Sequence, residues 1–194
     1  MVDPQRYYDL EAYLLNDVRQ RFHSEGSIGA FDFFSIVMWK ANRVKPQIAS
    51  RLRRMDPKGR TCLDPIVRDL TRSLHEAGDE QARMRLLMEA WHFGLPMTTA
   101  ILSILWPDEF TVYDTRVCEQ LGRFGKLANV TKFDRVWAGY CEYRGAVQGA
   151  APGQVSLRDK DRHLWASSVA RQLEADIASG FPKKSRQVEN LTAR

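Results

Sequence analysis

The chain has 194 residues with a net charge of +5, and 44% of them are hydrophobic and 27% charged, which is the composition of an ordinary globular protein. Its three cysteines are odd in number and far apart, so they fit no disulfide framework and no zinc or iron–sulfur ligand set, and neither a metal nor another cofactor is expected. No apolar run approaches the roughly 20 residues that span a bilayer, and the acidic, aromatic N-terminus does not resemble a signal peptide, so a cytoplasmic protein that does not enter membranes is predicted.

Helical periodicity dominates from the N-terminus onward. Leu10, Leu14, Val18 and Phe22 recur at steps of four residues and predict one amphipathic helix, which ends at the glycines of 26–29. Further helices are expected at 31–41, 46–55, 63–77, 79–91, 97–106, from 114 onward, at 131–147 and at 158–178. The best candidate for a strand, 110–113, stands alone. The predicted fold class is therefore all-α, with about nine helices.

Positive charge is concentrated between Lys40 and Arg60. Eight basic residues in this window are opposed by Asp56 alone, so the window carries more positive charge than the whole chain does. A basic face on a nearly neutral body favours binding of a polyanion, with nucleic acid as the first candidate. A solvated helix face is the alternative interpretation of the same charges.

A second pattern lies between the helices expected at 79–91 and 97–106. Gly94 makes a tight turn, and Pro96 precedes a nearly all-apolar helix. Such a hairpin points free backbone N–H groups and the positive end of a helix dipole at one place, where a DNA phosphate can bind. Any structural helical hairpin has this shape too, so the pattern alone leaves both interpretations open.

Asp114 follows the hairpin residue Ala100 by fourteen positions. Here the sequence resembles the helix-hairpin-helix DNA glycosylase superfamily, the group of endonuclease III-like and adenine-mismatch glycosylases. The family's hairpin pattern G-[VI]-G-x-[KS]-T-A falls on Gly94-Leu95-Pro96-Met97-Thr98-Thr99-Ala100, and its V-D-[TG]-[HN]-[VI] segment falls on Tyr113-Asp114-Thr115-Arg116-Val117. The segment between the two motifs is slightly shorter than in the family. The rest of the chain matches only in helix order and length.

The resemblance implies two helical lobes with a DNA-binding cleft between them. Residues 27–110 would form a central bundle that ends in the hairpin, and residues 1–26 together with 111–194 would form the second lobe. Asp114 is implied as the catalytic carboxylate, which stabilises the positive charge that develops on the sugar as the base departs. An aspartate before Thr-Arg-Val is also an ordinary helix N-cap, and the two roles are compatible.

Candidate DNA contacts follow from the resemblance and from residue chemistry. The residues expected to hold phosphates are Gly94, Pro96, Thr98, Thr99, Lys40, Arg43 and Lys45. A base flipped out of the duplex needs aromatic or amide groups, and the candidates for this pocket or wedge are Asn42, Trp39, Trp91, Tyr113 and Arg116. Each of these aromatics is also a candidate core residue. Arg116 has two other options, a pair with Asp114 or a phosphate contact.

Two departures from the family pattern bear on the chemistry. Strand-cutting relatives have a lysine where this chain has Thr98, and threonine cannot form a Schiff base, so no lyase activity is expected. Lys40 could supply an amine from elsewhere, which leaves that point open. Pro96 replaces the second hairpin glycine and removes one N–H donor. The predicted function is a monomeric, monofunctional glycosylase acting on double-stranded DNA in repair or in defence against modified foreign DNA. The alternative is a non-catalytic helix-hairpin-helix DNA-binding module.

Overall fold

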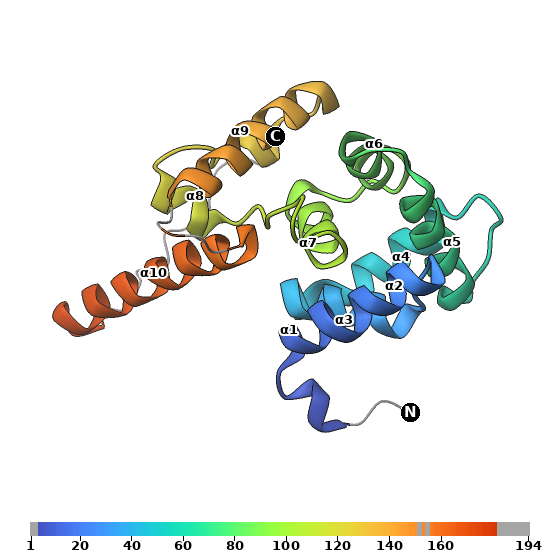
Figure 1. Ribbon diagram of the computed structural model, residues 1–194, viewed down its shortest axis with the longest axis horizontal. Helices are drawn as coiled ribbons and strands as arrows, with labels where there is room; N and C mark the ends of the chain where they lie inside the picture. Colours follow the sequence, from blue (N-terminus) through green and yellow to red (C-terminus); the bar gives the residue numbers. More distant parts are fainter. Residues whose placement is uncertain (1–3, 151–152, 154–155, 182–194) are drawn as a thin grey trace, which may run out of the picture.

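The computed structural model describes residues 4–150, 153 and 156–181. Its first seven α-helices are α1 (Leu10–Tyr13), α2 (Arg19–Glu25), α3 (Ala30–Ala41), α4 (Lys45–Met55), α5 (Leu63–Glu76), α6 (Glu80–Arg85) and α7 (Leu95–Leu105). The other three are α8 (Thr115–Leu121), α9 (Phe133–Ala150) and α10 (Leu157–Ala178). The described residues contain no strand, which confirms the predicted all-α class (Figure 1).

Two wider, π-helical turns continue α-helices without a break. One of them, η2 (Leu14–Val18), makes α1 and α2 one continuous helix, and the other, η4 (Leu86–Ala90), extends α6. Counted in this way, the described part of the chain has nine α-helical segments, in agreement with the sequence pattern. Three short 3₁₀ turns complete the set: η1 (Pro4–Tyr7), η3 (Asn42–Val44) and η5 (Leu127–Asn129).

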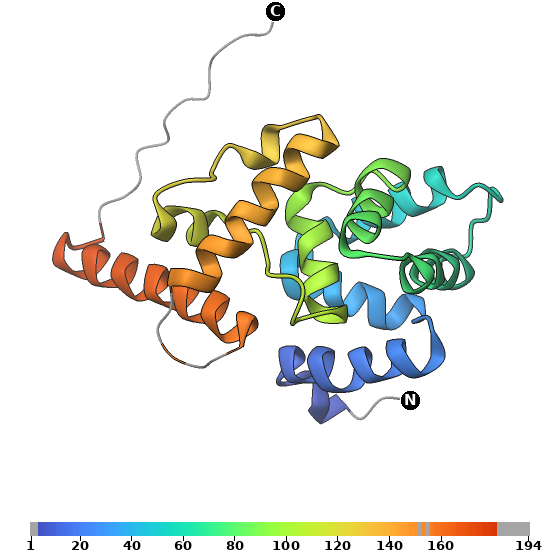
Figure 2. The ribbon, with the colours of Figure 1, turned by 45° about the horizontal axis from the view of Figure 1, so that its top comes forward.

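The helices gather into two groups, α1 to α7 and α8 to α10 (Figures 1 and 2). The N-terminal helix packs against α3 and α7 of the first group, and the predicted division into 27–110 and 1–26 plus 111–194 stays a prediction. The Tyr13 hydroxyl donates to Asp32 on α3 at 2.7 Å, and Glu11 on the same helix accepts from Arg158 and Arg162 of α10. The parts of the predicted second lobe at 151–152, 154–155 and 182–194 lie outside the described residues.

Both groups share one apolar core. α7 lies at its centre and is buried along almost its whole length, as its nearly all-apolar sequence predicts. The aromatic side chains of Phe110, Tyr140 and Tyr143 continue the core into the second group. No helix in the described ranges is long and apolar enough to cross a membrane.

An extended segment, 110–113, connects the two groups of helices. It is the stretch that the sequence favours as a strand, but side chains of α9, and not a neighbouring strand, bind its backbone. The Tyr140 hydroxyl accepts from the Thr111 N–H and donates to the Thr111 carbonyl, both at 2.9 Å. The Tyr143 hydroxyl donates to the carbonyl of Val112 at 2.8 Å. These bonds fix the course of the chain into α8.

Tyr140→Phe should destabilise the protein by roughly 2–3 kcal/mol, because it leaves a buried N–H and a buried carbonyl of Thr111 without their partner. Tyr140 is 0% exposed, so water cannot replace the lost hydroxyl without opening the core. Denaturant unfolding measures the change. Tyr8→Phe is the matched control, because Tyr8 is 99% exposed. Equal unfolding free energies for the two variants would contradict the assignment.

Candidate functional site

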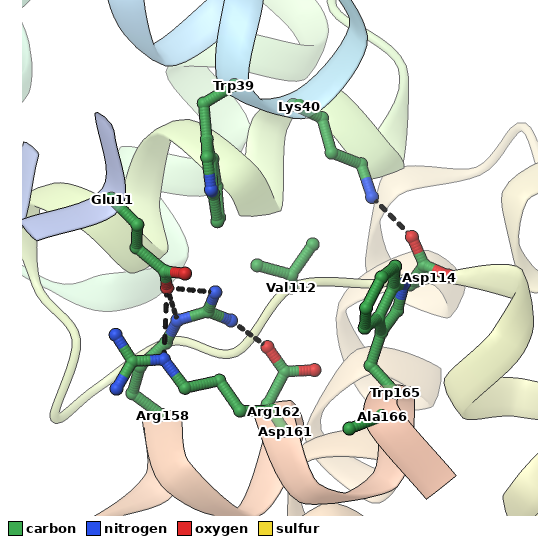
Figure 3. Close-up of a pocket in the computed structure, with 10 residues that line it drawn as sticks. All are labelled: Glu11, Trp39, Lys40, Val112, Asp114, Arg158, Asp161, Arg162, Trp165 and Ala166. Atoms are coloured by element: carbon green, nitrogen blue, oxygen red, sulfur yellow. Dashed lines mark hydrogen bonds and ion pairs between the residues drawn. The ribbon is translucent and has the colours of Figure 1, made fainter. Parts of the chain in front are cut away.

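A pocket of about 500 Å³ opens between the two groups of helices (Figure 3). It lies where α1, α3 and α10 approach the segment that leads into α8. Two tryptophans and six charged residues account for most of its lining: Trp39, Trp165, Glu11, Lys40, Asp114, Arg158, Asp161 and Arg162. The volume is in the range of pockets that bury a small organic group.

Asp114 stands at the start of α8 and on the wall of this pocket. Its Oδ1 accepts from the Arg116 N–H at 2.9 Å, which makes it the N-cap of the helix. Its Oδ2 accepts from Lys40 Nζ at 2.7 Å, although the two residues are 74 positions apart. Arg116 contributes through its backbone N–H, and its half-buried side chain is not among the groups that line the pocket. One carboxylate thus caps a helix and lines the pocket.

Opposing effects act on the Asp114 carboxyl. Burial on its own raises the pKa, but the Lys40 ammonium and the Arg116 N–H outweigh it and hold the pKa of Asp114 below its usual range. Asp114 is therefore an anion at any pH near neutrality. Only 15% of the Lys40 side chain and 24% of the Asp114 side chain are exposed, so solvent screens their attraction weakly.

Thr99 positions the segment that carries Asp114 and does not face solvent. Its Oγ1 accepts from the Tyr113 N–H at 2.9 Å and donates to the Leu95 carbonyl at 2.9 Å. Thr98 and Thr99 are both 0% exposed. Their side chains are therefore closed to an external group, so the predicted phosphate contact at Thr98 and Thr99 concerns the backbone of the hairpin. The reason is that α7 is apolar on all sides and enters the core within its first turn.

Arg158 organises the wall opposite Lys40. Its Nε donates to Glu11 Oε1 at 2.8 Å, and its guanidinium also pairs with Asp161. The guanidinium carbon lies 5.0 Å from the centroid of the Trp39 ring, a cation–π distance. Arg162 Nε donates to the same Glu11 oxygen at 3.1 Å. Sequence reasoning missed Glu11 and Arg158.

Asp161 is a second carboxyl in the pocket, and its environment differs from that of Asp114. Only 4% of its side chain is exposed. Burial raises the pKa of Asp161 to about 6 against the attraction of Arg158 and Lys40, and repulsion by Asp114 and Glu11 adds to the effect. Of these two carboxyls, Asp114 stays ionised and Asp161 takes up a proton just below neutral pH.

Two predicted base-contacting aromatics lie elsewhere. Tyr113 is 3% exposed, and its hydroxyl donates to the Phe124 carbonyl at 2.6 Å within the second group of helices. Trp91 is 7% exposed and borders a separate hollow of about 290 Å³, formed with the turn at 56–60. The prediction is corrected for both residues, because each is a buried core aromatic away from the pocket. Trp39 does line the pocket.

The hairpin turn between η4 and α7 is exposed at His92 and Gly94. His92 takes the left-handed backbone conformation, with φ 53°. Gly94 is the N-cap of α7 with φ −72° and ψ 156°, a conformation open to any residue. A Cβ added to Gly94 would meet only Pro96 Cδ, at 3.9 Å. The fold itself therefore gives no reason for a glycine here, and the backbone at this point is open to an external group.

The chain from η3 into α4 follows directly after Lys40. Asn42 and Arg43 are exposed, Lys45 is half-buried, and none of the three lines the pocket. The Arg51 guanidinium lies over the Phe93 ring, 5.8 Å from its centroid, so α4 lies beside the hairpin. Basic side chains and the hairpin turn therefore lie on neighbouring elements.

The C-terminal end of the basic window is internally neutralised. Arg60 pairs with Asp56 at 2.7 Å and with Asp69 at 2.9 Å, and Lys58 pairs with Asp69 at 2.8 Å. The net positive charge of the window therefore comes from its basic residues between Arg43 and Arg54.

The described residues hold no group of three or more His, Cys, Asp or Glu side chains that could bind a metal ion. No protein-family model, curated protein or solved structure matches this chain.

Proposed function

We propose that this protein is a DNA glycosylase that hydrolyses the bond between a flipped base and its sugar and leaves an abasic site. The observation that carries the proposal is the ionised Asp114 carboxylate, paired with Lys40 on the wall of a pocket of about 500 Å³. The C1′ atom of the sugar gains positive charge as the base departs. A fixed anion in a poorly solvated site stabilises that charge and can accept a proton from the attacking water.

The other pocket walls suit a base outside the duplex. Trp39 and Trp165 offer flat aromatic surfaces on two different helices, and Trp165 is 47% exposed although it lines the pocket. A stacked base would cover that surface. The charged groups of α10 and Glu11 offer hydrogen-bond donors and acceptors to the edge of the base.

Double-stranded DNA is the proposed partner, bound by a monomer without a cofactor. The turn before α7 presents an open backbone at the end of a helix dipole, where phosphate binds readily. Arg43, which is exposed, and Lys45, which is half-buried, follow Lys40 in the chain and add positive charge for phosphate binding. The hairpin and Asp114 are also the two places where the sequence resembles the helix-hairpin-helix glycosylases.

Base release tests the proposal. The full chain is incubated with duplexes that carry damaged, mismatched, alkylated or hypermodified bases, and mass spectrometry identifies the products. A free base together with an intact strand that contains an abasic site is the expected result. Salt-dependent binding without release from any duplex would favour the alternative, a non-catalytic DNA-binding module. Absence of salt-dependent binding would contradict both functions.

Gly94→Asp should change stability and DNA affinity in opposite directions. An aspartate N-cap at the start of α7 is expected to raise the free energy of unfolding by roughly 0.5–1 kcal/mol. The same carboxylate would repel a phosphate and raise the Kd for duplex DNA on the order of tenfold or more. Gly94→Asn has the same size and capping ability without the charge. Equal DNA affinity of the Asp and Asn variants would show that no phosphate binds at this turn.

A further inference from the structure

Asp161 projects from α10 into the pocket. One of its two carboxyl oxygens has no hydrogen-bond partner among the described residues that line the pocket. One oxygen accepts from Arg158, and the other points away from Arg158, on the side of Asp114 and Trp165 (Figure 3). A group placed in the pocket against the Asp114 carboxylate can therefore be reached by the second oxygen of Asp161.

The charges around Asp161 differ from those around Glu11 and Asp114, the other two carboxyls of the pocket. Glu11 on α1 accepts hydrogen bonds from two guanidinium nitrogens of Arg158, and Asp114 accepts one from Lys40 of α3. Glu11 also accepts from Arg162, whereas the one cation that Asp161 contacts, Arg158, is shared with Glu11. With Asp161 neutral, Lys40, Arg158 and Arg162 keep Asp114, Glu11 and Asp159 as their respective partners.

The remaining neighbours do not supply a further cation to this carboxyl. From α9, Tyr140 and Tyr143 are fully buried hydroxyls that donate to the backbone of 111–112, and burial raises the pKa of both. Arg162, on the same helix as Asp161, is bound to Glu11 and Asp159.

We propose that Asp161 donates the proton that lets the base leave, and that the substrate is a neutral base and not one made cationic by alkylation. This inference rests on the proposed glycosylase function. The Asp161 proton moves to a ring nitrogen or carbonyl oxygen of the base, and the bond from C1′ to the base breaks with its electron pair going to the base. Water adds to C1′ and loses a proton to Asp114. Both carboxyls then return to their starting states by proton exchange with solvent.

The substrate class follows from this chemistry. An alkylated, cationic base departs as a neutral molecule without receiving a proton, so a proton donor would add nothing. Lys40, Arg158 and Arg162 also line the pocket and carry hydrogen-bond donors. A neutral base gains from the proton donor, and its carbonyl or ring nitrogen can accept from the same basic groups.

Asp161→Asn tests the role, because the amide matches the neutral acid in size but cannot give up a proton. Base release from the neutral-base duplexes is measured between pH 5 and 9. The wild-type rate should fall as the pH rises above about 6. The variant should be slower by on the order of 10²-fold at the optimum and lose this fall. Glu174→Gln, an exposed position on the same helix, is the control and should equal the wild type.

Thermal unfolding detects the proton without any substrate. The pKa of Asp161 is raised from 3.8 to about 6 in the folded chain, so the folded state binds this proton more tightly than the unfolded state. The stability that results is present at pH 4 and is lost as the pH rises through about 6. The Tm of Asp161→Asn minus that of the wild type should therefore increase between pH 4 and pH 7, whereas Glu174→Gln should show no such trend.

Three results would overturn the inference. A Tm difference that does not change with pH would show that Asp161 carries no proton near neutrality. Release of a neutral base at equal rates by the wild type and Asp161→Asn would keep the glycosylase function but show that the proton comes from another group. Release of cationic 7-methylguanine and of no neutral base would contradict the proposal that the substrate is a neutral base. Release of no base by the wild type would instead remove the proposed function, and this inference with it.

Discussion

Asp114→Asn should lower the rate of base release by on the order of 10³-fold while affinity for duplex DNA stays the same or rises. The expected loss follows from charge, because asparagine keeps the size of the side chain but offers no anion to the sugar. DNA affinity should not fall, since the substitution removes a negative charge near a polyanion and frees Lys40 for a phosphate. Single-turnover release and a salt-dependent binding titration measure the two quantities.

The fold should survive this substitution, because asparagine is as good an N-cap as aspartate. The Lys40 ammonium, 15% exposed, loses its partner, which accounts for a modest drop in stability. Asp108→Asn is the matched control. Its side chain is 76% exposed and pairs with Arg19 at 3.1 Å, outside the residues that line the pocket. Unchanged release by Asp114→Asn would leave the carboxylate as a cap alone and support the non-catalytic module.

The helices could be predicted because each carries its own apolar spacing. Leu14, Val18 and Phe22 lie on one face and are all fully buried. The packing partner of that face could not be predicted, because an apolar stripe does not specify what covers it. For the N-terminal helix, the hydrogen bond from Tyr13 to Asp32 is a contact that the periodicity does not specify.

The site was predictable only in part. Asp114 lies in a sequence motif and Lys40 in a basic window, so each had a local signal. The packing of α3 on α7 brings the two residues together. Asp161 had no such local signal, because a carboxylate in a charged run is usually exposed. Its burial depends on contacts with Arg158, which in turn pairs with Glu11 near the other end of the chain. Core and pocket aromatics have the same sequence signal, so Trp39 could not be separated from Trp91.

Lys40→Met should reduce base release relative to the wild type by roughly 10- to 100-fold at pH 6, and by less at pH 8. Burial pushes the pKa of Asp114 upward, and the Lys40 ammonium is the strongest of the groups that lower it. Without that cation the carboxyl takes up a proton at higher pH than in the wild type, so the loss is largest on the acid side. Lys40→Arg keeps the cation and should retain most of the activity.

The same two variants decide whether Lys40 acts as a nucleophile. An attacking amine would be lost equally in the Met and Arg variants at every pH, and the wild-type protein would form a covalent DNA adduct on reduction with borohydride. Lys40 Nζ lies in an ion pair with Asp114 at 2.7 Å, and an ammonium group has no electron pair to attack with. Absence of an adduct, together with activity in Lys40→Arg, is therefore the expected result. A trapped adduct that both variants abolish would make this protein a strand-cutting enzyme whose amine comes from α3 and not from the hairpin.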